Sequence, residues 1–119
     1  MPKPRTVAYA CGLEAALDVV GGRWKVLILW DLDERHRFGE LKRIVTGISE
    51  KMLIQQLREM EADGIVHRKV FREVPPRVEY SLTPFGVSLR KALGPLCAWG
   101  TVHMERIGAR KKQAMASGQ

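Results

Sequence analysis

The chain has 119 residues, of which 45% are hydrophobic and 28% are charged, values typical of one globular domain with a single core. Twenty Lys and Arg against thirteen Asp and Glu give a formal net charge of +7, which favours a polyanionic partner, nucleic acid ahead of membrane. No apolar run is long enough to span a membrane and no secretion signal precedes the domain, so we expect a cytoplasmic protein with no membrane partner.

The N-terminal third predicts a loose arm followed by two helices. Residues 1–10 hold two prolines and two basic residues and are interpreted as a flexible basic arm. Residues 11–20 suit a short helix with Leu13 and Leu17 on its apolar side, and the next two glycines end it. Residues 23–33 form the most hydrophobic run, which favours a helix buried on most sides, with Trp24 and Trp30 in the core.

Residues 38–64 carry the signature of two helices joined by a short turn. A polar turn over residues 33–37 leads into a helix over residues 38–45, and the tight link Thr46-Gly47-Ile48 leads into a longer helix. Two helices joined through a turn with glycine are typical of the helix-turn-helix motif. In that geometry the first helix crosses the DNA backbone and the second enters the major groove.

The second of these helices has clear ends and two different faces. Ser49 suits the N-cap and Gly64 suits the left-handed residue that closes the helix. An apolar stripe recurs at helical spacing and must face a core; it consists of Leu53, Leu57 and Met60. Roughly opposite lie three groups that can meet phosphates and base edges, namely Lys51, Gln55 and Arg58. The alternative is an ordinary amphipathic helix with a solvated charged face.

After Gly64 the apolar period changes from helical to two, which predicts strands over residues 65–72 and 77–82. The proline-rich loop between them makes the pair a wing, and we expect Arg72 and Arg77 to reach a phosphate or a minor groove. A plain surface hairpin with solvated arginines is the alternative. Lys42 and Arg43, at the end of the preceding short helix, are expected near phosphates.

The C-terminal third predicts helices that need a partner. Thr83-Pro84 begins a helix, and Gly94-Pro95 is expected to break or kink it. Residues 109–119 are interpreted as a disordered tail. The apolar surface of the terminal helices favours a homodimer; the predicted interface residues are Leu13, Leu17, Leu96, Trp99 and Val102.

With these residues in view, the chain resembles the HxlR-type winged helix-turn-helix regulators, relatives of the MarR group. The matching motifs run in one order through residues 11–103. They are Cys11 with Leu13-Glu14 and Leu17-Asp18, Gly21-Gly22-Arg23-Trp24-Lys25, Arg37-Phe38-Gly39-Glu40-Leu41, Gly47-Ile48-Ser49 with Lys51-Met52-Leu53, Leu57-Arg58 with Glu61-Ala62-Asp63-Gly64, Val74-Pro75-Pro76-Arg77-Val78-Glu79-Tyr80, and Leu82-Thr83-Pro84 with Gly86.

The resemblance implies an α+β, mainly α fold over residues 11–108, with a two-stranded wing and extra N- and C-terminal dimerisation helices. It implies a homodimeric transcriptional regulator, often a repressor, that binds double-stranded operator DNA and lies in the cytoplasm. The predicted DNA-contacting set is Lys42, Arg43, Ser49, Lys51, Ile54, Gln55, Arg58, Arg72 and Arg77. Ile54 departs from the Thr or Ser common in the family and could contact a thymine methyl group.

Cys11 falls on the position where the resemblance places a redox- or electrophile-sensing thiol, although Gly12 replaces the family's usual proline. A helix N-terminus favours the thiolate, which oxidants attack. The alternative is a small buried apolar residue. We expect Cys97 to lie in the core or an interface.

Two other classes of function are alternatives to the regulator. A protein-interaction module that keeps the winged helix without specific DNA binding is the main alternative, and the polar, basic face of the second helix argues against it. A thiol enzyme is third, because Cys11 has no evident base and no phosphate loop or paired-carboxylate motif is present. The two cysteines and scattered histidines form no metal-site spacing, so no metal and no cofactor are expected, and the sequence names no small-molecule effector.

Overall fold

The computed structural model describes residues 8–117 and contains a mainly helical domain with one small sheet. The chain divides into two units, Met1–Gly86 and Val87–Gln119. The elements in order are α1 (Gly12–Val20), α2 (Trp24–Asp31), β1 (His36–Arg37), α3 (Phe38–Ile44), α4 (Glu50–Ala62), β2 (Val66–Phe71), β3 (Arg77–Leu82), α5 (Pro84–Val102) and α6 (Met104–Ser117). This order confirms the predicted winged helix-turn-helix.

Helix α4 begins and ends where the sequence predicted. The Ser49 hydroxyl accepts a hydrogen bond from the Met52 amide at 3.1 Å, so it caps the first turn. At the other end Gly64 has φ +77°, and the Ile65 amide donates to the Met60 carbonyl at 2.9 Å. This bond, together with the bond from the Gly64 amide to the Glu61 carbonyl, forms a Schellman motif.

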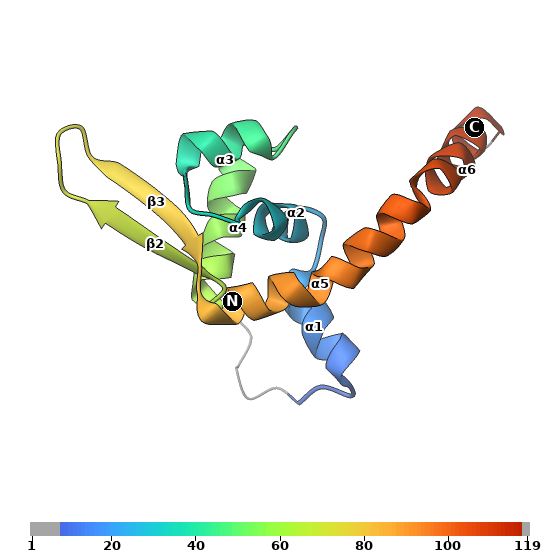
Figure 1. Cartoon of the computed structure of the whole chain (residues 1–119), viewed down its shortest axis with the longest axis horizontal. Coiled ribbons are helices and arrows are strands. Elements are labelled where there is room, and N and C mark those ends of the chain that lie inside the picture. Colours follow the sequence, from blue (N-terminus) through green and yellow to red (C-terminus); the bar gives the residue numbers. More distant parts are fainter. Residues whose placement is uncertain (1–7, 118–119) are drawn as a thin grey trace. The chain divides into compact units, whose positions relative to one another are not determined.

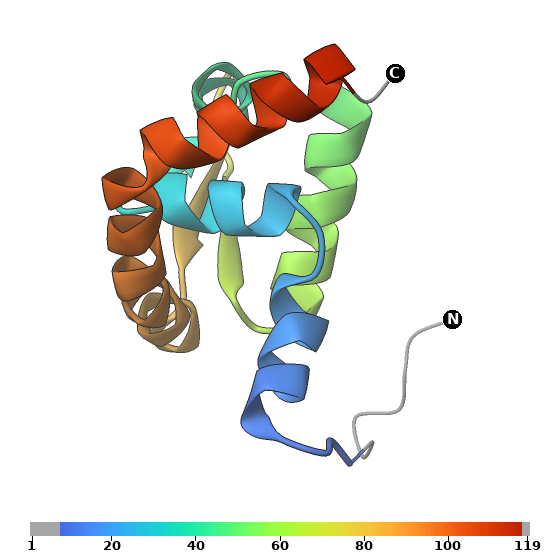
Figure 2. The same cartoon turned by 90° about the vertical axis from the view of Figure 1, so that its right-hand side faces the viewer.

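The core of the first unit lies beneath α4, where α2 and α3 pack (Figure 1). Figure 2 shows α4 (green) beside α2 (light blue) from the side. Leu53 is completely buried and Leu57 is 2% exposed, so the predicted apolar stripe faces this core. The other buried apolar residues are Ile28, Leu29, Leu32, Leu41, Val45, Ile48, Met60, Ile65 and Val66. Trp24 and Trp30 are only half-buried.

The wing hairpin projects from these helices (Figure 1) and belongs to a three-stranded antiparallel sheet with strand order β1-β3-β2. The two-stranded wing, β2 with β3, is therefore confirmed, and a short third strand is added to its sheet, because β1 pairs His36 with Tyr80 and Arg37 with Glu79. Two residues are too few to show an alternating pattern, which explains why the sequence indicated only a polar turn there. The β1 pairing ties the base of the wing to the start of α3.

Thr83 joins the end of α4 to the start of α5. Its hydroxyl donates toward the carbonyls of Gly64 and Ile65, at 2.5 and 3.2 Å, and accepts from the Gly86 amide at 3.0 Å. Its own amide donates to the Ile65 carbonyl at 3.0 Å. Gly86 is buried, and an added Cβ would lie 2.2 Å from the Ile65 carbonyl oxygen. Only glycine allows this close approach.

The second unit corrects two predictions. Helix α5 continues through Pro95 to Val102, so of the expected break or kink at Gly94-Pro95 the break is wrong. Lys91 and Pro95 are both exposed, so water can satisfy the carbonyl that loses its N–H partner. The predicted disordered tail is also wrong as far as Ser117, because α6 runs from Met104 to that residue. Its strong helix formers, mainly Ala, Arg, Lys, Gln and Met, outweigh its position near the chain end.

The predicted arm over residues 1–10 falls mostly outside the described residues. Within residues 8–117, no helix combines the length and the apolarity that a membrane span requires.

Candidate nucleic-acid interface

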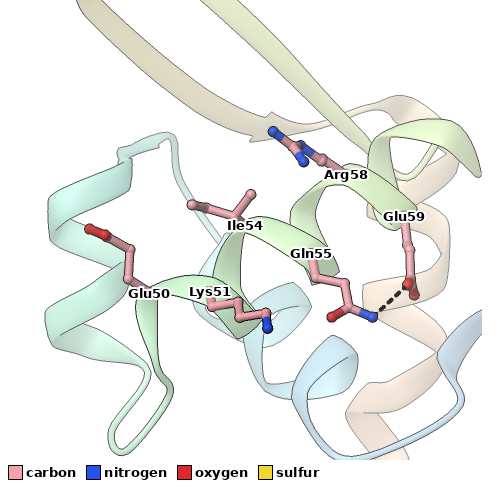
Figure 3. Close-up of a pocket in the computed structure, with 6 residues that line it drawn as sticks. All are labelled: Glu50, Lys51, Ile54, Gln55, Arg58 and Glu59. Carbon is pink, nitrogen blue, oxygen red and sulfur yellow. Dashed lines mark hydrogen bonds between the residues drawn. The ribbon is translucent and has the colours of Figure 1, made fainter.

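The outer face of α4 presents the polar groups that the sequence predicted. Lys51, Ile54, Gln55 and Arg58 are all exposed, while the leucines of the same helix lie in the core. Together with Glu50 and Glu59, these four side chains line a surface hollow (Figure 3). The face is therefore anchored by burial beneath and open to solvent above, as a helix that enters a groove requires.

The same face carries two carboxylates that the sequence reading did not single out, Glu50 and Glu59. The Lys25 ammonium of α2 lies 2.6 Å from Glu59 Oε1. The Gln55 amide donates to Glu59 Oε2 at 3.3 Å, the contact dashed in Figure 3. The hydrogen bond from Lys25 is the main cause that lowers the pKa of Glu59. Glu59 is thus ionised at neutral pH and partly neutralised by Lys25.

The end of α3 and the link to α4 place two further cations. Lys42 and Arg43 are exposed in the last turn of α3. Gly47 has φ +88° in the link, and Ile48, which follows it, is 1% exposed. The buried Ile48 anchors the turn, so the position of α3 relative to α4 is set by the core. Ser49 remains exposed, but its hydroxyl is used as the cap of α4.

The two arginines of the wing have different surroundings. Arg72 is exposed in the loop that follows β2. Arg77 instead pairs with Phe71 across the hairpin, and its guanidinium carbon lies 4.0 Å from the centre of that ring. Its Nε is 3.6 Å from carboxylate oxygens of both Glu73 and Glu79. The two arginines that the sequence assigned to one role therefore differ: Arg72 lies in the exposed loop, whereas Arg77 contacts other residues of the wing.

A second hollow lies between α4 and the sheet. It is lined by Ile54, Leu57, Arg58, Glu61, Arg68 and Tyr80. Arg58 and Ile54 line both hollows, so they lie where the helix face meets the wing. Sequence reasoning missed Arg68 and Tyr80, because residues on a strand reach this place only through the pairing of β2 with β3.

Both cysteines are free and exposed. Cys11 is the N-cap residue of α1, and its carbonyl accepts from the Ala15 amide at 3.2 Å. The alternative of a buried Cys11 is therefore wrong for this chain. Cys97 is not a core residue either, since it is exposed on α5. Among the described residues, no group of three or more His, Cys, Asp or Glu side chains could hold a metal ion.

The predicted dimer residues form uncovered apolar surfaces in each unit. In α1, Leu13 is 70% exposed and Leu17 is 57% exposed, and no residue of that helix is buried. In α5, Leu96, Trp99 and Val102 are between 57% and 77% exposed. Large apolar side chains gathered in this way mark interaction surfaces.

Comparison with known proteins places this geometry in a family. The model of the HxlR-like helix-turn-helix family matches residues 19–108. The HTH-type transcriptional regulator YtcD of Bacillus subtilis is 50% identical over 100 residues, which cover 83% of this chain and 79% of YtcD. The solved structure of the redox regulator HypR in its reduced form is 44% identical, with a TM-score of 0.77, and covers 83% of this chain and 99% of HypR. The reduced transcriptional regulator YodB from B. subtilis is 37% identical, with a TM-score of 0.68, and covers 77% of this chain and 92% of YodB.

Proposed function

This chain belongs to the HxlR-like helix-turn-helix family of transcriptional regulators, and from that membership we propose that it acts as a homodimeric repressor that binds a palindromic operator. The observation that carries the proposal is the outer face of α4, which holds Lys51, Gln55 and Arg58 in solvent while Leu53 and Leu57 hold the helix in the core. A helix fixed from below and polar above is suited to read bases in a major groove.

Each part of the surface has an assigned role in this proposal. Lys51, Gln55 and Arg58 contact base edges, and Ile54 packs on a thymine methyl group. Four residues contact phosphates. They are Lys42 and Arg43 at the end of α3, Ser49 at the start of α4, and Arg72 in the wing loop. Because Arg77 is held by Phe71 and two carboxylates, its role is to stiffen the wing.

Selection of genomic duplexes on the purified protein tests the proposal. The expected result is one enriched promoter with two half-sites about 34 Å apart, which is one turn of DNA. Mobility shifts then compare this duplex with a scrambled duplex at two salt concentrations. Equal affinity for both duplexes at every salt concentration would favour the interaction module without specific DNA binding.

Arg72→Ala should weaken binding to every duplex by a similar factor. An exposed arginine that contacts only phosphate carries no sequence information, so the selected and scrambled duplexes should be affected alike. The slope of log affinity against log salt should fall by about one. Arg110→Ala is the matched control, because Arg110 is an exposed arginine on α6, outside the wing. A loss confined to the selected duplex would assign Arg72 to base reading.

Trp99→Glu should convert the homodimer into monomers. The apolar faces of α1 and α5 are uncovered in each unit, and we propose that a second copy covers them. Sedimentation equilibrium should give twice 13.5 kDa for the parent chain and a monomer for the variant. Val74→Glu, at a fully exposed position in the wing loop, should remain dimeric. A Trp99→Glu variant that sediments like the parent would remove α5 from the interface.

Oxidation of Cys11 should change the affinity for the operator. The thiol is exposed at the start of α1, and the chain is similar to a redox regulator over most of its length. Diamide takes two electrons from a pair of thiols and leaves a disulfide. Operator binding by the parent and by Cys97→Ser should respond to diamide, whereas Cys11→Ser should not. Equal responses in all three proteins would exclude Cys11 from the mechanism.

A further inference from the structure

A polar chain links α2 to the outer face of α4. Lys25 of α2 has a side chain only 15% exposed, and its Nζ lies 2.6 Å from Glu59 Oε1. The other carboxylate oxygen, Oε2, accepts from Gln55 Nε2 at 3.3 Å. Gln55 is one of the residues assigned above to base reading, so this chain connects a base-reading amide to the body of the domain.

The carboxylate determines which way the Gln55 amide faces. A carboxylate only accepts hydrogen bonds, so the NH2 group of Gln55 must point to Glu59 and the carbonyl oxygen must point elsewhere. Lys25 in turn holds Glu59, because an ion pair with a largely buried partner is less screened than one in open solvent. The amide therefore has one hydrogen committed to Glu59, one hydrogen available and an oxygen available.

We propose that Lys25 and Glu59 are positioning residues that set the base preference of Gln55. Held in this orientation, Gln55 offers one acceptor and one donor, which match the N6 amino group and N7 of adenine. Guanine presents two acceptors, N7 and O6, and its O6 would face the oxygen of the held amide. A glutamine released from Glu59 could turn and offer both hydrogens. The pair thus favours adenine over guanine at the position that Gln55 reads. This inference rests on the function proposed above.

The test uses selection from one randomised duplex library by the full-length parent and by variants. The parent should enrich adenine at one position in each half-site. Glu59→Ala, which keeps a good helix former at a partly exposed position, should lower the ratio of adenine to guanine there by about tenfold, the order of one well-placed bidentate contact. Lys25→Met, which keeps the aliphatic stem, should lower the ratio in the same direction. Glu105→Ala is the control, because Glu105 is an exposed carboxylate on α6 that lines neither hollow, and it should leave the ratio unchanged.

A second background separates positioning from direct contact. In Gln55→Ala the adenine preference should be absent already, so adding Glu59→Ala should change nothing further in the enriched sequences. A further change at any base would show that Glu59 itself reads DNA, and it would overturn the inference. The inference would also be overturned if the parent, Glu59→Ala and Lys25→Met all enriched the same sequence with the same base ratios. A parent that enriches no sequence would refute the proposed function itself.

NMR of the protein without DNA measures the order of the Gln55 side-chain amide. This order would not change if Glu59 only stabilised the fold. The side-chain NH2 of Gln55 should be more ordered in the parent than in Glu59→Ala, as measured by 15N relaxation. Gln56, the next residue on α4, donates to the Met52 sulfur at 3.5 Å and has no bond to Glu59, so its NH2 should be unchanged. Equal order of the Gln55 NH2 group in the parent and in Glu59→Ala would overturn the inference.

Discussion

Gly86→Ala should destabilise the protein by about 3 kcal/mol, the upper end of the usual range for overpacking. The new Cβ would lie 2.2 Å from the carbonyl oxygen of Ile65 and 3.1 Å from its carbonyl carbon. These are backbone atoms that cannot rotate away. The same carbonyl accepts from the amide and the hydroxyl of Thr83, so its movement would also break the link between α4 and α5. Urea unfolding at one fixed protein concentration measures the loss of unfolding free energy.

Gly39→Ala is the matched control for this prediction. Gly39 lies in α3, is exposed, and an added Cβ would meet only the end of the flexible Arg43 side chain at 3.8 Å. Alanine in an unstrained helix should leave stability equal or raise it by about 0.5–1 kcal/mol. If Gly86→Ala unfolds at the same urea concentration as Gly39→Ala, the close contact between α5 and Ile65 is wrong.

Arg58→Ala should abolish most sequence-specific binding while it leaves most of the general affinity for DNA. Arg58 is exposed where α4 meets the wing and lines both surface hollows. A bidentate arginine contact to guanine contributes about 1–3 kcal/mol of discrimination, so affinity for the selected duplex should fall by about 10- to 100-fold. Mobility shifts with the selected and scrambled duplexes measure both affinities.

Arg58→Lys separates charge from geometry. Lysine keeps the positive charge but loses the planar fork that bonds two acceptors at once. If Arg58 reads a base, the lysine variant should also lose preference for the selected duplex, while its affinity for the scrambled duplex should stay near that of the parent. An Arg58→Ala variant that binds the selected duplex as tightly as the parent would mean that the assigned groove face is wrong.

Much of the interface could be predicted from the sequence because its signals are local. The spacing of the α4 leucines, the cap at Ser49 and the left-handed Gly64 each depend on residues within one or two turns. The order of the motifs along the chain was enough to indicate the family. The errors arose where a rule about a single position was outweighed by the helix-forming residues around it. Pro95 does not end α5, and the residues near the C-terminus continue as α6.

The amino-acid sequence by itself determined which face of α4 is apolar, where that helix begins and ends, and that a hairpin follows it. Only the tertiary structure decided which residues of other elements contact the side chains of the polar face and of the wing. The contact between Lys25 and Glu59 joins residues far apart in the chain, and it exists because α2 and α4 pack on one core. The pairing of β1 with β3 and the engagement of Arg77 with Phe71 are likewise products of strand register. Such contacts leave no periodic trace, because each depends on which residues of two packed segments come to lie opposite one another.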